Sequence, residues 1–187
     1  MAVLEGKRRE EANAIVARYP SSRSAMMPLL YLVQSVEGYV SRDGMREVAE
    51  ILGLTTADVE AVATFYSMYR FEPSGRYVLS VCTNVSCALL GARGLYNDAR
   101  EALEANPAEV GATEGITLHE EECLGACEQA PVVTVNFTNY ARMTTERMRE
   151  LVASLRGGEP LPPTQGAEPP ADLRETSRQL AGLGAAE

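Results

Sequence analysis

Residues 122–136, ECLGACEQAPVVTVN, hold Cys123 and Cys127 with three residues between them, followed by a proline and a short apolar run typical of a strand. Two cysteines at this spacing form a strained local disulfide, half of a metal site, or ordinary packing. Cys82 and Cys87, in VCTNVSCALLG, complete the pattern C-x4-C, 35 residues, C-x3-C, and the chain has four cysteines in all. The first question that the sequence raises is therefore whether the two cysteine pairs form one shared site.

Two close cysteine pairs in a reducing cytosol are more often metal ligands or redox groups than structural disulfides. The spacing favours an iron–sulfur site, which takes four thiolates, and leaves open structural zinc and free or disulfide-bonded thiols. A helix starting at Cys87 would lower the pKa of its thiol, and Gly125 would turn backbone N–H groups toward sulfur. The single histidine, His119, excludes the two-histidine Rieske arrangement and is expected on a half-exposed strand.

Length, charge and apolar patterning limit the classes of function. A chain of 187 residues suits one large domain or two small ones, and a net charge of −9 argues against nucleic acid as a partner. The longest apolar run, residues 25–33, is too short to span a bilayer and is interrupted by Pro28. The N-terminal stretch lacks the apolar core of a signal peptide, so we expect a cytoplasmic protein without direct membrane insertion.

Residues 1–72 are predicted to form a small helical bundle. Ser41 before the apolar positions and Gly53 after them bound one helix, and Thr55 with Asp58 has the capping-box spacing that starts the next. Apolar residues at helical spacing mark three faces: Leu29, Leu30, Val33 and Val36; Met45, Val48, Ala49 and Leu52; Val59, Val62, Ala63 and Tyr66.

Residues 73–156 are predicted to form an α/β layer in the order β, α, β, β, β, α. The expected elements are a strand at 77–82, a helix at 88–104, a strand at 116–120, a hairpin of 132–136 with 140–143, and a last helix with Met148, Leu151, Val152 and Leu155 on its apolar face. Five of the ten prolines lie between residues 160 and 170, so 157–187 is predicted to be an extended or disordered tail, with a helical turn of RETSRQLAGL against a partner as the alternative. The fold class is α+β.

The cysteine pattern, together with ECLGACEQAPVVTVN and the preceding TFYSMYRFEPSGRY, resembles the thioredoxin-like [2Fe–2S] subunit family of bacterial NADH:quinone oxidoreductase, respiratory complex I. The resemblance covers residues from about 5 to 156. It implies a helical N-terminal part and a thioredoxin-like domain with one [2Fe–2S] cluster on Cys82, Cys87, Cys123 and Cys127. The hairpin tip NFTNY departs from the family by lacking an acidic residue.

The resemblance also implies partners. Family members associate with a flavoprotein subunit that binds NADH and FMN, so the chain would be an oxidoreductase subunit at the cytoplasmic face of the inner membrane, with no NADH or FMN site of its own. Accordingly, the sequence has neither a G-x-G-x-x-G fingerprint after a strand nor a Walker A motif. Equivalent subunits of NAD-linked hydrogenases and formate dehydrogenases remain open, as do a zinc-stabilised interaction module and a thiol–disulfide oxidoreductase, although the last lacks a C-x2-C pair.

Two weaker signals accompany the cysteines. Glu120, Glu121, Glu122 and Glu128 flank the second pair and are expected to lower the reduction potential of a cluster, unless solvent screens them. The aromatic residues Tyr66, Tyr69 and Phe71 are expected to pack in the core or an interface rather than to carry electrons. The isomer of the bond before Pro131 is not readable from the sequence.

Overall fold

The computed structural model describes residues 2–104, 115–164 and 168–184. These form two compact units, each considered by itself: a helical unit that ends at Pro73 and takes in the chain again from Leu173, and an α/β unit from Ser74 to Asp172. The expected division into 1–72, 73–156 and 157–187 remains a prediction. Within the described residues, no helix combines the length and apolar character needed to cross a membrane.

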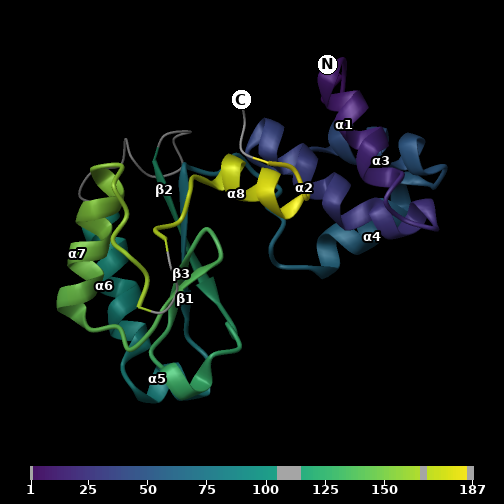
Figure 1. Ribbon diagram of the computed structural model, residues 1–187. Helices are drawn as coiled ribbons and strands as arrows, with labels where there is room; N and C mark the ends of the chain where they lie inside the picture. Colours follow the sequence, from purple (N-terminus) through teal and green to yellow (C-terminus); the bar gives the residue numbers. More distant parts are fainter. Residues whose placement is uncertain (1, 105–114, 165–167, 185–187) are drawn as a thin grey trace. The chain divides into compact units, whose positions relative to one another are not determined.

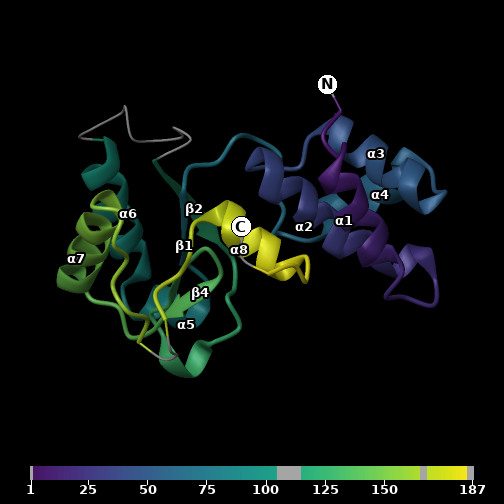
Figure 2. The same ribbon diagram turned by 45° about the horizontal axis from the view of Figure 1, so that its top comes forward.

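The helical unit contains the predicted helices together with one from the far end of the sequence (Figures 1 and 2). Its elements are α1 (Lys7–Val16), the 3-10 turn η1 (Ser22–Ala25), α2 (Met26–Glu37), α3 (Arg42–Leu52), α4 (Thr56–Phe65) and α8 (Leu173–Leu180). The predicted caps are confirmed: the Ser41 hydroxyl accepts from the Gly44 amide at 2.9 Å, and Thr55 and Asp58 form a complete capping box. Gly53, at φ 68°, ends α3.

The core of the helical unit centres on α2. Leu29, Leu30, Leu32 and Val33 of this helix are fully buried. Gly44 lets α3 approach it, because a Cβ at that position would lie 2.4 Å from Cγ1 of Val33. Close contact between these two helices therefore depends on a residue without a side chain.

The aromatic prediction is confirmed in one position only. Tyr69 is buried, its hydroxyl donates to the Met27 carbonyl at 3.1 Å, and its ring centroid lies 5.1 Å from that of Tyr31. Tyr66 and Phe71 are 36% and 43% exposed, so core packing is wrong for these two side chains, and their packing in an interface stays a prediction. Tyr66 follows α4 in an extended conformation, which takes it off the buried face of the helix.

The α/β unit has a four-stranded sheet in the order β2-β1-β3-β4. Its elements are β1 (Tyr77–Cys82), α5 (Val85–Leu89), α6 (Ala92–Glu104), β2 (Ile116–Glu121), the 3-10 turn η3 (Cys127–Gln129), β3 (Val133–Val135), β4 (Thr138–Tyr140) and α7 (Thr145–Arg156). Strands β1 and β2 are parallel, whereas β3 is antiparallel to both β1 and β4. Helices α6 and α7 lie side by side along the sheet (Figure 1). Along the chain, the strands and helices follow one another in the predicted order, apart from the division of the first helix into α5 and α6.

The hairpin differs from its prediction in register. Its second strand ends at Tyr140, so a strand at 140–143 is wrong. Asn136 and Phe137 have positive φ angles, 45° and 71°, and form a two-residue turn that pairs Val135 with Thr138. The tight turn brings the return strand two residues earlier than the polar loop suggested.

The helix expected over 88–104 is interrupted. Asn84 caps a short helix, α5, by accepting from the Val85 amide at 2.6 Å, and Gly91 at φ 91° separates α5 from α6. Cys87 therefore lies inside α5 rather than at the start of a long helix.

Candidate metal centre

The first cysteine pair lies where β1 ends and α5 follows. Cys82 is the last residue of β1, and its amide donates to the Val132 carbonyl at 3.2 Å, which ties it to the residue just before β3. Cys87 is held by α5. Both side chains are buried, with 4% and 2% of their surfaces exposed. The fold thus buries Cys82 and Cys87, the first pair of the candidate site, away from solvent.

The second pair lies in the loop that connects β2 with β3. Cys123 follows β2 and Cys127 begins η3, and both are exposed. Gly125 between them has φ 72°, and its amide donates to Sγ of Cys123 at 3.4 Å. The expectation that Gly125 turns an N–H group toward sulfur is confirmed. The loop continues through a cis peptide bond between Ala130 and Pro131.

The loop after β2 lies against the end of β1, where Sγ of Cys82 donates to the carbonyl of Glu122, next to Cys123, at 3.7 Å. The Cys87 thiol interacts with those of Cys82 and Cys127, and the Cys127 thiol interacts with those of Cys123 and Cys82. All four cysteines are free thiols in the structure. The second loop, whose first cysteine comes 36 positions after Cys87, thus lies near the first loop, and a site shared by all four thiols stays a prediction.

The thiol of Cys87 does not have the lowered pKa expected from a helix start. Burial raises the pKa of Cys87 to about 11, and the neighbouring Cys82 and Cys127 thiols add to the effect, against a hydrogen bond from the Val132 amide that lowers it. Cys87 is the third residue of α5 and is 2% exposed, so loss of solvation outweighs the helix end. The pKa of Cys127 is also raised, chiefly by the charge of Cys123.

Hydrogen-bond donors surround the sulfur atoms. The Ser86 hydroxyl donates to Cys127, the Val132 amide to Cys87, and the Gly125 amide to Cys123. Ser86 and Val132 were not among the residues chosen from the sequence. A serine beside a cysteine is too common a neighbour to be noticed without knowledge of where the second loop lies.

The rim of the site combines acids with exposed apolar side chains. Glu120, Glu122 and Glu128 are part of it, and Glu120 accepts from the Thr83 hydroxyl at 2.6 Å. Val85, Leu89 and Leu90, on α5 or just after it, are 67%, 81% and 61% exposed. Cys82 and Cys87 pack in one small apolar cluster with Ala92, Val132, Leu124, Ala126 and Ala130. His119 is half-buried on β2 opposite Ser80, as expected of a strand residue.

The donor set fits an iron–sulfur cluster. Four thiols, two from each loop, with N–H and O–H donors directed at three of the sulfurs, are the ligands and outer contacts that such a cluster takes. In the described part of the chain, no group of three or more His, Cys, Asp or Glu side chains is arranged to hold a metal ion. The agreement with an iron–sulfur cluster therefore rests on the type and number of the donor atoms and not on their geometry.

Comparison with known proteins identifies the family. The sequence model of the thioredoxin-like [2Fe-2S] ferredoxin family matches residues 12–156. The chain belongs to the thioredoxin-like [2Fe–2S] ferredoxin family. This confirms the predicted resemblance, and with it a thioredoxin-like fold for the α/β part next to a helical N-terminal region.

Relatives of this ferredoxin carry the names of oxidoreductase subunits. A subunit of the NADH-quinone oxidoreductase of Mycobacterium tuberculosis is 46% identical over 173 residues, which are 92% of this chain and 68% of the relative. NADH-quinone oxidoreductase subunit 2 of Thermus thermophilus is 41% identical over 148 residues, 78% of this chain and 82% of that protein. A solved NAD+-reducing [NiFe]-hydrogenase is similar in fold alone, with a TM-score of 0.58 and 21% identity, over 71% of this ferredoxin and 23% of that chain.

Proposed function

We propose that Cys82, Cys87, Cys123 and Cys127 hold one [2Fe–2S] cluster and that the chain is an electron-transfer subunit of an NADH:quinone oxidoreductase. The observation that carries the proposal is the approach of two loops, each with two free thiols, at the end of β1, where Sγ of Cys82 lies 3.7 Å from the Glu122 carbonyl. Relatives at 41% and 46% identity bear the name of that enzyme's subunits, which favours it over an NAD-linked hydrogenase or formate dehydrogenase assembly. When bound, such a cluster accepts and returns one electron.

The residues around the thiols have separate tasks in this proposal. Cys82 and Cys87 bind from the buried side and shield the site from water, whereas Cys123 and Cys127 bind from the exposed side. The amides of Val132 and Gly125 and the hydroxyl of Ser86 stabilise thiolate charge. The protein would thus both cover the site and offset part of its negative charge.

The partner in this proposal is a flavoprotein subunit that binds FMN and NADH. The exposed apolar side chains Val85, Leu89 and Leu90 belong to α5, the helix that also holds Cys87, or follow it directly. A partner bound to them would lie close to the proposed cluster. Exposed apolar groups rimmed by charges are typical of protein–protein contacts. The chain would then reside at the cytoplasmic face of the membrane through its complex, and by itself would not oxidise NADH.

Anaerobic purification tests the cluster. The expected result is a red-brown protein with two irons and two sulfides per chain, as the composition of the cluster requires, whose colour bleaches with dithionite. Serine at any of Cys82, Cys87, Cys123 or Cys127 should change the visible spectrum, whereas Ala88→Ser, next to Cys87, should leave it unaltered.

A colourless protein that contains zinc would refute the cluster and support the zinc-stabilised interaction module instead. Retention of the native spectrum in all four serine variants would refute the ligand assignment. A separate experiment tests which assembly contains the chain. Purification of the intact complex and identification of its other subunits would distinguish a quinone-linked assembly from a hydrogenase.

A further inference from the structure

The described residues after α7, 157–164 and 168–184, make contacts in both units. We call them the strap. The first part lies along the α/β unit through three groups of hydrogen bonds: Tyr140 Oη to the Leu161 carbonyl at 2.6 Å, the Ala141 amide to the Thr164 hydroxyl at 3.1 Å, and Asn136 Nδ2 to the Ala171 carbonyl at 2.8 Å. Prolines give this part an extended form, as the sequence predicted.

Asn136 is a strong anchor for the strap because the rest of its side chain is already held. It is 2% exposed, its Oδ1 accepts from the Val78 amide at 2.8 Å, and its Nδ2 also donates to the Arg76 carbonyl at 3.1 Å. One side chain at the hairpin turn therefore joins β1 to the strap, two residues before α8 begins.

The last part of the strap, α8, packs on α2 of the helical unit. Leu173, Ser177 and Ala181 recur every fourth residue and are 1%, 0% and 2% exposed, so they form its buried stripe. Ser177 accepts from Nε2 of Gln34 at 3.1 Å, and Gln34 is itself completely buried. Nε2 of Gln34 also donates to the Met68 carbonyl at 3.4 Å, so loss of α8 would remove one of the two partners of this buried amide nitrogen.

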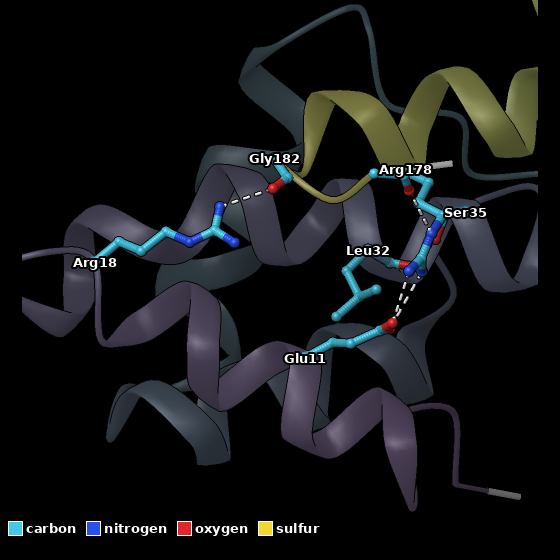
Figure 3. A network of polar contacts seen from close by, with 7 residues as sticks. Glu11, Arg18, Leu32, Ser35, Arg178 and Gly182 are labelled. Atoms are coloured by element: carbon cyan, nitrogen blue, oxygen red, sulfur yellow. Dashed lines mark hydrogen bonds and ion pairs between the residues drawn. The ribbon is translucent and has the colours of Figure 1, made fainter. Parts of the chain in front are cut away.

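Arginine side chains bind α8 and the turn that follows it to the rest of the helical unit, as Figure 3 shows for Arg178 and Arg18. The Arg178 guanidinium donates to both carboxylate oxygens of Glu11, at 2.7 and 3.2 Å, and the two side chains are only 20% and 14% exposed. Nη1 of Arg18 donates to the Gly182 carbonyl at 2.8 Å. Arg174 donates to the last carbonyls of α2, those of Val36 and Glu37.

We propose that the strap is a second tether between the two units and that the docking of α8 on α2 fixes its end in the helical unit. The chain leaves the helical unit at Pro73 and returns to it at Leu173, so the α/β unit is an insertion joined to the helical unit by two chain crossings. With α8 docked, both crossings limit the positions that the α/β unit takes relative to the helical unit. With α8 released, only the crossing at residues 73–74 remains. The inference does not depend on the cluster.

Reversing the charge of Arg178 in the full, cluster-loaded chain tests this tether. Arg178→Glu places two carboxylates together in a mostly buried contact, so hydrogen exchange of the α8 amides should accelerate about tenfold or more while β1 and β3 keep their protection. The double variant Glu11→Arg with Arg178→Glu should restore protection. The control is Arg46→Glu, which breaks the exposed pair of Arg46 with Asp43 at 2.9 Å and should leave α8 unchanged.

Small-angle scattering on the same variants tests the mechanical role. The distribution of interatomic distances should broaden in Arg178→Glu and return to that of the wild type in the charge-swapped double variant. If Arg178→Glu does not fold, Arg178→Gln provides the milder break. The proposal is overturned if α8 already exchanges freely in the wild type, or if α8 is released without any change in the scattering.

Discussion

At the scale of single residues, the four cysteines are alike in sequence and unlike in environment. Cys82 and Cys87 are buried at the end of the sheet, whereas Cys123 and Cys127 are exposed on a loop. Burial raises the pKa of Cys87, while the pKa of Cys127 is raised first by its neighbour Cys123. The spacing of the cysteines predicted which residues would bind a metal centre. The exposure of each thiol to solvent is decided by the position of its loop in the fold.

Ser86 provides a test of how hydrogen bonds tune the proposed cluster. Its hydroxyl donates to Cys127, and a donor to sulfur stabilises the more negative, reduced state. Ser86→Ala should therefore lower the reduction potential by about 20 to 60 mV, the equivalent of one hydrogen bond. Ser86→Thr, which keeps the hydroxyl, is the control. A potential that is equal in the wild type and both variants would contradict the assigned role.

The acids on the rim give a second prediction of potential, with the opposite sign. Replacing Glu120, Glu121 and Glu122 with Gln removes negative charge near the site and should raise the midpoint potential in a redox titration. The effect should shrink as salt is added, because exposed charges are screened. An unchanged potential at low salt would show that solvent already screens these carboxylates.

At the scale of elements, caps and glycines decided where helices begin and end. Ser41, Thr55 and Gly53 bound their helices as the sequence predicted, because each acts within a few residues of itself. The break at Gly91 and the turn at Asn136 and Phe137 were missed. At the turn, the side chain of Asn136 accepts from the Val78 amide of β1, a contact between residues 58 positions apart that the local sequence does not show.

Two helical glycines give a matched test of packing. Gly44→Ala puts a methyl group 2.4 Å from the side chain of Val33 and should lower the free energy of unfolding by about 1 to 3 kcal/mol. Gly94→Ala, in α6 with nothing within 4 Å, should instead raise it by about 0.5 to 1 kcal/mol. Urea denaturation followed by circular dichroism measures both. Equal effects at the two positions would contradict the close approach of α3 to α2.

At the scale of the whole molecule, the helical unit is assembled from segments far apart in sequence. Glu11 and Arg178, separated by 167 positions, form a mostly buried ion pair, and Gln34 is paired with Ser177. The tail, expected to be extended or disordered, is in its described part an extended arm followed by a helix. The amphipathic pattern of this helix is short and polar, so its role becomes visible only beside α2.

The ion pair predicts a loss of stability in acid. The hydrogen bond from Arg178 holds the pKa of Glu11 below its ordinary 4.5, helped by the charges of Arg178, Lys7 and Arg8 and opposed by burial. The stabilisation is present above the unfolded-state pKa and is lost as pH falls through the lower folded-state pKa. The stability difference between wild type and Glu11→Gln, measured by urea denaturation, should be largest near pH 7 and shrink below 4.5.

Arg178→Gln serves as the control for this pH dependence. In that background Glu11 has lost its main partner, so the effect of Glu11→Gln should be smaller and should vary less with pH. A difference between wild type and Glu11→Gln that stays constant from pH 7 to pH 3 would contradict the proposed contribution of the pair.

The sequence by itself determined the candidate ligand set, the helical and α/β parts and the order of strands, because periodicity, caps and cysteine spacing are written in neighbouring residues. Only the tertiary structure decided which thiols are buried, that the pKa of Cys87 rises rather than falls, where the hairpin turns, and that α8 belongs with α2. These features depend on solvation and on contacts between distant parts of the chain. Local sequence signals do not encode either directly.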